Sequence, residues 1–140
     1  MKKLLFILLT VFSISCNNEI DLNIDPENQT VPDYNLLSES QPLKYDSVAN
    51  KYSAEPILYL RPFENVSDTD IVTIKFNSPQ FSRYIIKGDT LYNNDKVNIK
   101  YLDFTNFLIK FKYESESKNT HSITVETTIK SVNKSTIITF

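Results

Sequence analysis

The sequence predicts an all-β protein: an immunoglobulin-like antiparallel β-sandwich of about seven strands, following a signal peptide and a flexible tether. From residue 57 onward, apolar and polar side chains alternate in short runs separated by polar turns, the pattern of strands with one buried face. No run after the first 16 residues shows the 3.6-residue period of an amphipathic helix. A small β-barrel is the main alternative, because the Cys…Trp…Cys set of antibody domains is absent.

Residues 1–16 have the layout of a bacterial lipoprotein signal. Lys2 and Lys3 precede an apolar to weakly polar run over residues 4–14, and small residues lead into Cys16. A lipoprotein signal peptidase cuts before a cysteine whose thiol carries diacylglycerol. A transmembrane anchor fits less well, because the run would span only ~17 Å as a helix, about half the hydrocarbon thickness. We therefore expect residues 1–15 to be removed and Cys16 to be lipidated.

Charge and cysteine content limit the remaining chain. The 140 residues hold 15 Lys+Arg and 17 Asp+Glu, and loss of Lys2 and Lys3 leaves 13 against 17. This mild acidity gives no reason to expect a nucleic-acid partner. Cys16 is the only cysteine, so no disulfide can form within the chain. The domain must therefore be stabilised by its hydrophobic core.

Residues 16–54 are expected to be the lipidated cysteine and a polar tether, and residues 55–140 the domain. The tether contains Pro26 and Pro32 and shows no sustained period. Some of its side chains are apolar, including Leu36, Leu43 and Tyr52, so the sequence leaves open whether residues 36–54 dock as a strand.

Five strands are expected in the first part of the domain, over residues 57–63, 71–76, 84–86, 90–92 and 97–101. Pro62 suits an edge strand or a strand end, because it has no N–H to donate. Val72, Ile74 and Phe76 fall on one face of the second strand. Turns are expected at residues 87–89, around Gly88, and at residues 93–95, where asparagine tolerates a positive φ.

The last third of the chain shows the clearest alternation. It predicts strands over residues 107–113, 123–130 and 135–140, with a polar loop at 115–120 and a turn at 131–134. The inward side chains would be Phe107, Ile109, Phe111, Tyr113, Ile123, Val125, Thr127, Ile129, Ile138 and Phe140. Three successive strands with short connections predict an antiparallel meander.

No residue pattern predicts catalysis, a metal or a cofactor. His121 is the only histidine, and its neighbour Ser122 would point to the opposite face of a strand. One histidine and no free cysteine make a zinc site improbable. Glu64, Asn65, Asp68 and Asp70 offer oxygen ligands, but they lack the spacing of a calcium loop, so an acidic solvated turn is expected.

Two further features concern binding and modification. Tyr59, Tyr84, Tyr92, Tyr101 and Tyr113 could form an aromatic platform for sugars, although tyrosine at alternating strand positions is more often core or rim. Asp46-Ser47-Val48 and Asp89-Thr90-Leu91 resemble the Asp-Ser/Thr-aliphatic acceptor of periplasmic O-glycosylation in some Gram-negative bacteria. Ser47 and Thr90 are therefore candidate glycosylation sites, with Ser47 the more accessible.

The order of several short segments resembles the TraQ-like conjugal transfer lipoproteins of conjugative transposons. The resemblance covers residues 57–140, together with the signal, Cys16 and the acidic start at residues 19–21. The segments are residues 72–76 (VTIKF), 94–95 (ND), 107–113 (FLIKFKY), 123–126 (ITVE) and 137–140 (IITF). The family's Asp-Asn-Phe-Gly-like turn before the last strand is replaced by residues 132–135 (VNKS). The resemblance implies an Ig-like lipoprotein without catalytic residues.

We therefore expect a non-enzymatic lipoprotein of the bacterial envelope. It would be anchored in the outer membrane through lipid on Cys16, would face the periplasm or the cell surface, and would bind an envelope protein, as an accessory of conjugal transfer. A glycan- or small-ligand-binding surface lipoprotein is the alternative. A hydrolase is the least favoured class, because it would need a pocket that holds an acid or base with a perturbed pKa.

Overall fold

The computed structural model describes residues 31–78, 81–117 and 122–140, which contain twelve strands, one short 3-10 helix and no α-helix. The elements in chain order are β1 (Asp33–Glu39), β2 (Lys44–Asp46), β3 (Lys51–Ala54), β4 (Ile57–Glu64), β5 (Ile71–Asn77), β6 (Ser82–Ile86), β7 (Asp89–Leu91), β8 (Lys96–Lys100), η1 (Tyr101–Asp103), β9 (Leu108–Lys110), β10 (Lys112–Ser115), β11 (Ser122–Ile129) and β12 (Val132–Thr139). Every strand pair is antiparallel, so the predicted all-β sandwich class is confirmed, with more strands than the expected seven.

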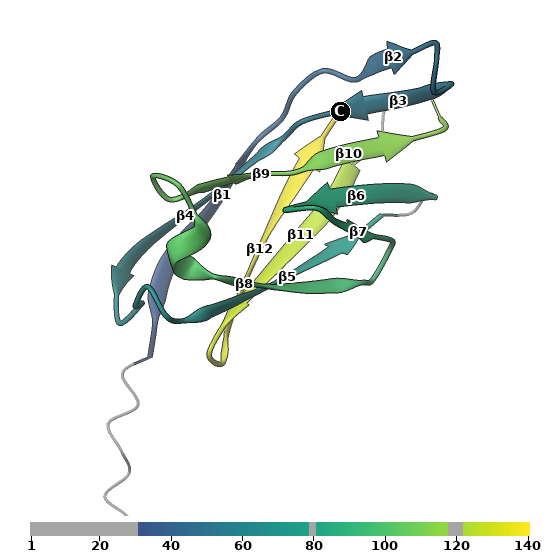
Figure 1. Ribbon diagram of the computed structural model, residues 1–140. Coiled ribbons are helices and arrows are strands. Elements are labelled where there is room, and N and C mark those ends of the chain that lie inside the picture. Colours follow the sequence, from purple (N-terminus) through teal and green to yellow (C-terminus); the bar gives the residue numbers. More distant parts are fainter. Residues whose placement is uncertain (1–30, 79–80, 118–121) are drawn as a thin grey trace, which may run out of the picture.

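The first layer of the sandwich consists of two sheets placed end to end. One has the order β1-β4-β9 and the other β2-β3-β10-β6-β7. They run into each other because only two residues separate β3 from β4 and one residue separates β9 from β10. At this break Pro56 has no N–H to donate, and its carbonyl oxygen accepts the Phe111 N–H at 3.3 Å. One long, bent layer results (Figure 1).

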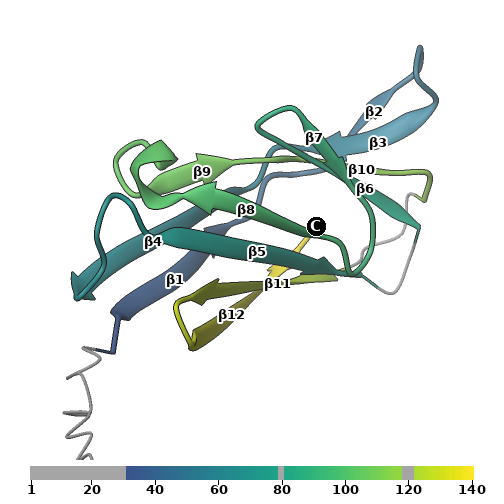
Figure 2. The same ribbon diagram turned by 60° about the horizontal axis from the view of Figure 1, so that its bottom comes forward.

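The second layer is a four-stranded sheet with the order β12-β11-β5-β8. Its strands β11 and β12 cross β6 and β10 at a steep angle (Figure 1), and Figure 2 shows β5, β11 and β12 on one side of β4 and β9. Because the two layers present apolar faces to each other, the core lies between them.

An aromatic cluster fills the centre of the core. The Phe76 and Tyr84 rings stack with centroids 4.5 Å apart, and Phe111 lies 4.8 Å from Phe76. Tyr113 stacks on Phe140 at 4.5 Å, so the last residue of the chain closes one end of the core. The inward positions predicted for residues 72–76 and 123–129 are buried as expected.

The domain begins earlier than residue 55. Residues 33–54, assigned above to the tether, contain β1, β2 and β3, which answers the question left open for residues 36–54. The buried Tyr34 hydroxyl explains the docking of β1: it lies 3.0 Å from the Thr127 carbonyl oxygen and 3.1 Å from that of Val132. The polar composition of this segment did not predict a strand, because the outward positions of β1 are polar or charged apart from Leu37.

Three local predictions in the last third need correction. The expected meander does not form, because β10 pairs with β3 and β6 whereas β11 pairs with β12 and β5 in the other layer. Alternation shows which face of a strand is buried, but not which strand lies beside it. Phe107, expected inside, is 49% exposed because its φ of +66° places it in a turn. The turn expected at residues 131–134 is a shorter one, with Lys130 at φ +53° and β12 starting at Val132.

Two other local predictions hold. Positive φ angles occur at Asn50, Asn65, Asn94 and Asn106, as expected for a chain that uses asparagine in place of glycine. Gly88, at φ +92°, forms the turn between β6 and β7. Pro62 departs in part from the expectation of an edge strand or a strand end: β4 is the central strand of its sheet and Pro62 pairs with Tyr34 of β1, but it lies beyond the segment of β4 that pairs with β9.

Candidate functional site

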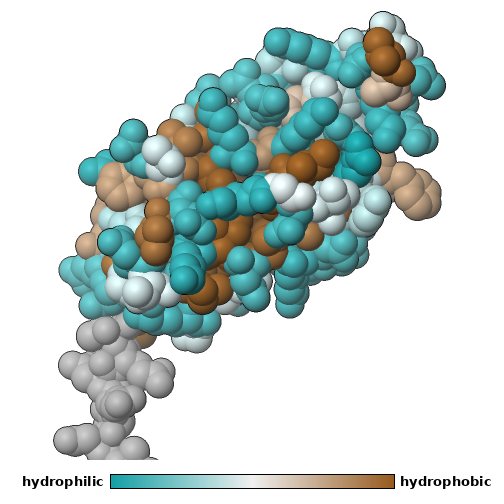
Figure 3. All heavy atoms as spheres, in the orientation of Figure 1, coloured by the Kyte–Doolittle hydropathy of each residue, from teal (hydrophilic) through white to brown (hydrophobic). Residues whose placement is uncertain are grey.

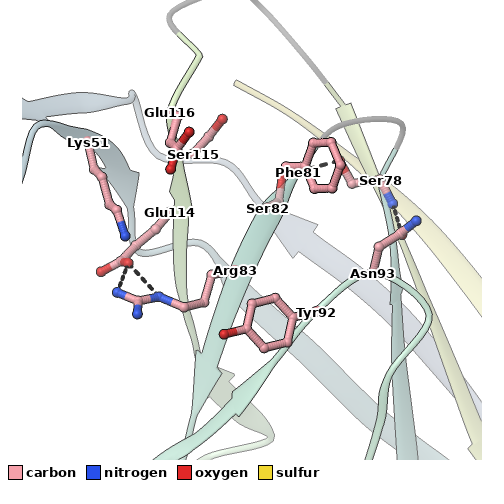
Figure 4. A pocket seen from close by; sticks show the side chains of 10 residues that line it. All are labelled: Lys51, Ser78, Phe81, Ser82, Arg83, Tyr92, Asn93, Glu114, Ser115 and Glu116. Carbon is pink, nitrogen blue, oxygen red and sulfur yellow. Dashed lines mark hydrogen bonds and ion pairs between the residues drawn. The ribbon is translucent and has the colours of Figure 1, made fainter.

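A groove of about 560 Å³ lies at one end of the five-stranded sheet, in the size range of small-ligand sites. It is lined by residues from β3, β6 and β10 and from the segments flanking β6 and β7: Lys51, Ser78, Phe81, Ser82, Arg83, Tyr92, Asn93, Glu114, Ser115 and Glu116. Figure 4 shows Lys51, Glu114 and Arg83 side by side, with the Tyr92 ring next to Arg83 and the Phe81 ring farther along the groove.

The charged wall of the groove is an ion cluster centred on Glu114. This side chain is only 8% exposed, and the strand register places it directly opposite Arg83. Arg83 donates from Nε to Glu114 Oε2 at 2.8 Å and pairs with the same oxygen through Nη2, while Lys112 Nζ lies 2.7 Å from Oε1. Partial desolvation opposes ionisation, yet the bonds and charges of Lys112 and Arg83 outweigh it and hold the pKa of Glu114 below its ordinary value.

The floor of the groove is a buried polar group. Ser78 and Ser82 are both buried, with their hydroxyl oxygens 3.4 Å apart, and the Ser82 hydroxyl lies 3.0 Å from that of Tyr113. Burial raises the pKa of Tyr113 and raises that of the neighbouring Tyr84 to about 12. Both phenols therefore keep their protons at neutral pH and can serve as hydrogen-bonding groups, not as bases.

The aromatic wall of the groove is held by the turn between β7 and β8. The Tyr92 N–H donates to Asp95 Oδ2 at 2.8 Å, and Asn93 Oδ1 accepts the Ser78 N–H at 2.7 Å. These bonds fix the backbone on either side of Tyr92. The Tyr92 side chain is 59% exposed, and that of Phe81 is 100% exposed. The groove thus combines two exposed rings with cationic and hydrogen-bonding side chains, a set suited to binding.

Local sequence patterns do not reveal most of this groove. Glu114 falls on the outward side of its strand, where a solvated carboxylate is the ordinary expectation. Its burial follows from the neighbours Arg83 and Lys112, and the Arg83 pairing depends on a strand register that local patterns do not reveal. Among the five tyrosines considered for a sugar platform, Tyr84, Tyr101 and Tyr113 are buried, Tyr59 is half-buried, and only Tyr92 reaches the groove.

The two candidate glycosylation sites differ in setting. Ser47 lies in the exposed turn between β2 and β3, where Asp46 Oδ1 accepts the N–H groups of Val48 at 2.9 Å and Ala49 at 3.1 Å. Thr90 is exposed but lies inside β7, opposite Ile85. Figure 3 shows a brown apolar group at the β2–β3 end of the molecule, where Val48 is 96% exposed. Cys16 and His121 lie outside the described residues.

The acidic loop between β4 and β5 is a structural turn. Asp70 Oδ2 accepts the Ser67 N–H at 2.9 Å and lies 3.4 Å from Lys130 Nζ. Desolvation works against the Asp70 charge, but the bonds from Ser67 and Lys130 lower the pKa of this carboxylate. Across residues 31–78, 81–117 and 122–140, no three His, Cys, Asp or Glu side chains are grouped to hold a metal ion.

Comparison with known proteins identifies the fold. No family model and no curated protein matches the sequence. A solved structure of a conjugative transposon lipoprotein from Bacteroides eggerthii is similar, with a TM-score of 0.54 and 17% identity, over 77% of this chain and 98% of that one. A lipoprotein from Bacteroides thetaiotaomicron gives a TM-score of 0.55 and 17% identity, over 77% of this chain and 80% of that one. At this identity the likeness extends to the fold alone.

In the part of the chain that the structure describes, no helix is both long and apolar enough to cross a membrane.

Proposed function

We propose that this chain is a lipid-anchored protein of the bacterial outer membrane, facing the periplasm or the cell surface, whose β-sandwich binds an envelope protein of a conjugal transfer apparatus. Two proteins that share the fold are described as lipoproteins, one of them of a conjugative transposon. The TraQ-like order of segments and the signal ending at Cys16 point the same way.

One observation carries the proposal: the start of β1 and the binding features lie at opposite ends of the sandwich. β1 begins at the lower left of Figure 1, whereas the β2–β3 hairpin and the groove-lining ends of β3, β6 and β10 lie at the upper right. A chain anchored through Cys16 would enter the domain at the β1 end. The groove and the exposed hairpin would then point away from the membrane, toward a partner.

The experiment that tests this proposal is Cys16→Ala in the intact gene. Without the acylated thiol the protein should leave the membrane fraction after a carbonate wash, and complementation of DNA transfer in a deletion strain should fail, because anchoring raises the local concentration at an envelope partner. Ser135→Ala, an exposed change on the other layer, is the control. Unchanged membrane retention of Cys16→Ala would overturn the lipoprotein proposal.

A non-enzymatic role leads to a second test, at the only histidine. His121→Ala should complement as well as the unaltered gene, because binding through the sandwich surface needs no acid–base residue. Loss of complementation at normal protein levels would favour an enzymatic or ligand-site role.

A glycan- or small-ligand-binding role is the second candidate, and the groove favours it. The exposed Tyr92 ring lies next to Arg83, and the exposed Phe81 ring lies farther along the same groove, so a flat, hydroxylated ligand could stack and accept hydrogen bonds there. Calorimetric titration with bacterial oligosaccharides would detect such binding, and Tyr92→Ala should abolish it while leaving the fold unchanged. Saccharide binding unaffected by Tyr92→Ala would exclude the groove.

O-glycosylation at Ser47 is a further part of the proposal. An exposed turn presents the acceptor hydroxyl to an enzyme, whereas Thr90 is held in a paired strand. The protein from its native host should lose the mass of a glycan in Ser47→Ala, beyond the change due to the substitution itself, and should lose no glycan mass in Thr90→Val. An unmodified native mass would refute this assignment.

A further inference from the structure

The outer face of the sheet β1-β4-β9 carries an apolar row with no covering element in the described residues. The strand register places Leu37, Tyr59 and Leu108 directly beside one another across the three strands. Their neighbours in sequence point inward, since Leu36 packs against the core and Leu58, Leu60 and Ile109 are buried. Leu37 is 60% exposed, and Tyr59 and Leu108 are half-buried. Exposed apolar rows rimmed by polar residues are typical of interfaces.

The neighbouring row gives this face its charge pattern. Glu39, Ile57 and Lys110 lie side by side across the same strands, so a carboxylate and an ammonium group flank an apolar centre. The two charges are two strands apart, about 10 Å, too far for an ion pair within one sheet. Glu39 accepts hydrogen bonds from Tyr59 at 2.8 Å and Gln41 at 3.2 Å, and Lys110 has no ion-pair partner among the described residues.

We propose that this face binds a second copy of the same chain, through a two-fold axis that runs along β4. Rotation about that axis places β1 of one copy over β9 of the other. Glu39 then faces Lys110 of the second copy, twice, while Leu37 faces Leu108 and Tyr59 faces Tyr59. The face is therefore complementary to itself, as an isologous interface must be.

The membrane anchor, which is part of the proposed function, agrees with the same axis. A two-fold axis along the strands keeps both β1 starts at one end of the dimer, so both lipidated cysteines could enter one membrane. An in-plane axis across the strands would put the two β1 starts at opposite ends and would separate Glu39 from Lys110. Charge pattern and anchor thus select the same arrangement.

The test cross-links the full-length protein in intact cells. Ile57 lies on the axis, so Ile57→Cys should place two thiols opposite each other, within reach of a short bis-maleimide. Cys16 is the only native cysteine and would carry lipid, so each chain offers one thiol. Ser135→Cys, exposed on the outer face of the other layer, is the matched control. A product of twice the chain mass should form with Ile57→Cys and fall at least fivefold with Ser135→Cys.

Charge reversal distinguishes this pairing from chance collision. In the Ile57→Cys background, Glu39→Lys alone and Lys110→Glu alone should each lower the cross-linked yield on the order of tenfold, because two attractive pairs become repulsive. The double variant should restore the yield, and so should co-expression of the two single variants. Arg61 also lies on the axis and would face Arg61 of the second copy. Because these two like charges repel each other, Arg61→Gln should raise the yield.

Three outcomes would overturn the proposal: equal yields from Ile57→Cys and Ser135→Cys, no rescue by the double variant, or a cross-linked product containing a different protein. These outcomes are separate from failure of the anchor. A missing anchor would show as loss of the protein from the membrane fraction, whereas a missing dimer would leave membrane-bound protein with no charge-dependent product.

Discussion

At the scale of single residues, a buried hydroxyl group joins the two layers. The Tyr34 hydroxyl on β1 reaches the backbone of β11 and β12, and it also lies 3.2 Å from the Thr127 hydroxyl. The side chain is fully buried, so water cannot replace these partners. A single hydroxyl therefore connects the first strand to the opposite layer.

Tyr34→Phe should lower the free energy of unfolding by about 1–3 kcal/mol, because it leaves buried hydrogen-bonding groups without their partner. Denaturant titration would measure the change. Tyr45→Phe is the matched control, since the Tyr45 hydroxyl donates to Asn50 at an exposed position, and it should stay within about 0.5 kcal/mol. Equal losses in the two variants would contradict a special role for the Tyr34 hydroxyl.

Glu114 gives the domain a pH dependence. Its pKa in the folded protein is lowered from the ordinary value, about 4.3 for glutamate, so its contribution to stability is complete above that value. The contribution is lost as the pH falls through the folded-state pKa. Stability of the native chain should therefore decline in acid, and Glu114→Gln should flatten part of that decline. Thermal unfolding from pH 7 to pH 2 would show the difference.

Glu126→Gln is the control for this slope. Glu126 is 45% exposed and has one long ion pair, 3.7 Å from Lys75. Its removal should leave the acid decline as in the native chain, because exposed pairs contribute little. If Glu126→Gln flattened the slope as much as Glu114→Gln, burial of the Glu114 cluster would not be its cause.

At the scale of elements, β1 and the β2–β3 hairpin differ in what they bury. β1 pairs with β4 along its whole length and contributes Tyr34 to the core, whereas all three residues of β2 are exposed. Replacing residues 33–39 with Gly and Ser should abolish cooperative unfolding. Replacing residues 47–50 with Asn-Gly, which keeps the Asp46–Lys51 pair, should cost about 1 kcal/mol or less, because all four replaced residues are exposed. Circular dichroism during thermal unfolding would compare the two.

Sequence patterns predict the faces of most elements but not their pairing. Alternation correctly places Val72, Ile74 and Phe76 inside, because burial on a strand has a period of two. It cannot place β10 and β11 in different layers, since that depends on contacts between distant segments. The Glu114 cluster could not be predicted for the same reason. Lys112 is two residues from Glu114 in the sequence, but Arg83 lies opposite Glu114 only because of the strand register.

At the scale of the whole molecule, the groove is formed by segments that are far apart in the sequence. Lys51, Arg83, Tyr92 and Glu114 come from four separate segments and converge in the groove (Figure 4), at the end of the sheet that lies away from the β1 start (Figure 1). The length of chain before β1 then determines how far the groove could stand from an anchor.

Shortening that segment should separate anchoring from function. Residues 17–30 could reach at most about 50 Å when fully extended, and deletion of residues 20–29 reduces this to about 14 Å. The deleted chain should still fold and stay in the membrane fraction, because β1 and Cys16 are intact. Complementation of DNA transfer should nevertheless fail, because the groove could no longer reach a partner held away from the membrane.

A chain in which residues 20–29 are replaced by ten Gly and Ser residues is the control for length. It should complement fully, since reach depends on the number of residues more than on their identity. Failure of this replacement would mean that the segment itself is recognised. Full activity of the shortened chain would place the partner at the membrane surface and would remove the reason for a groove at the far end.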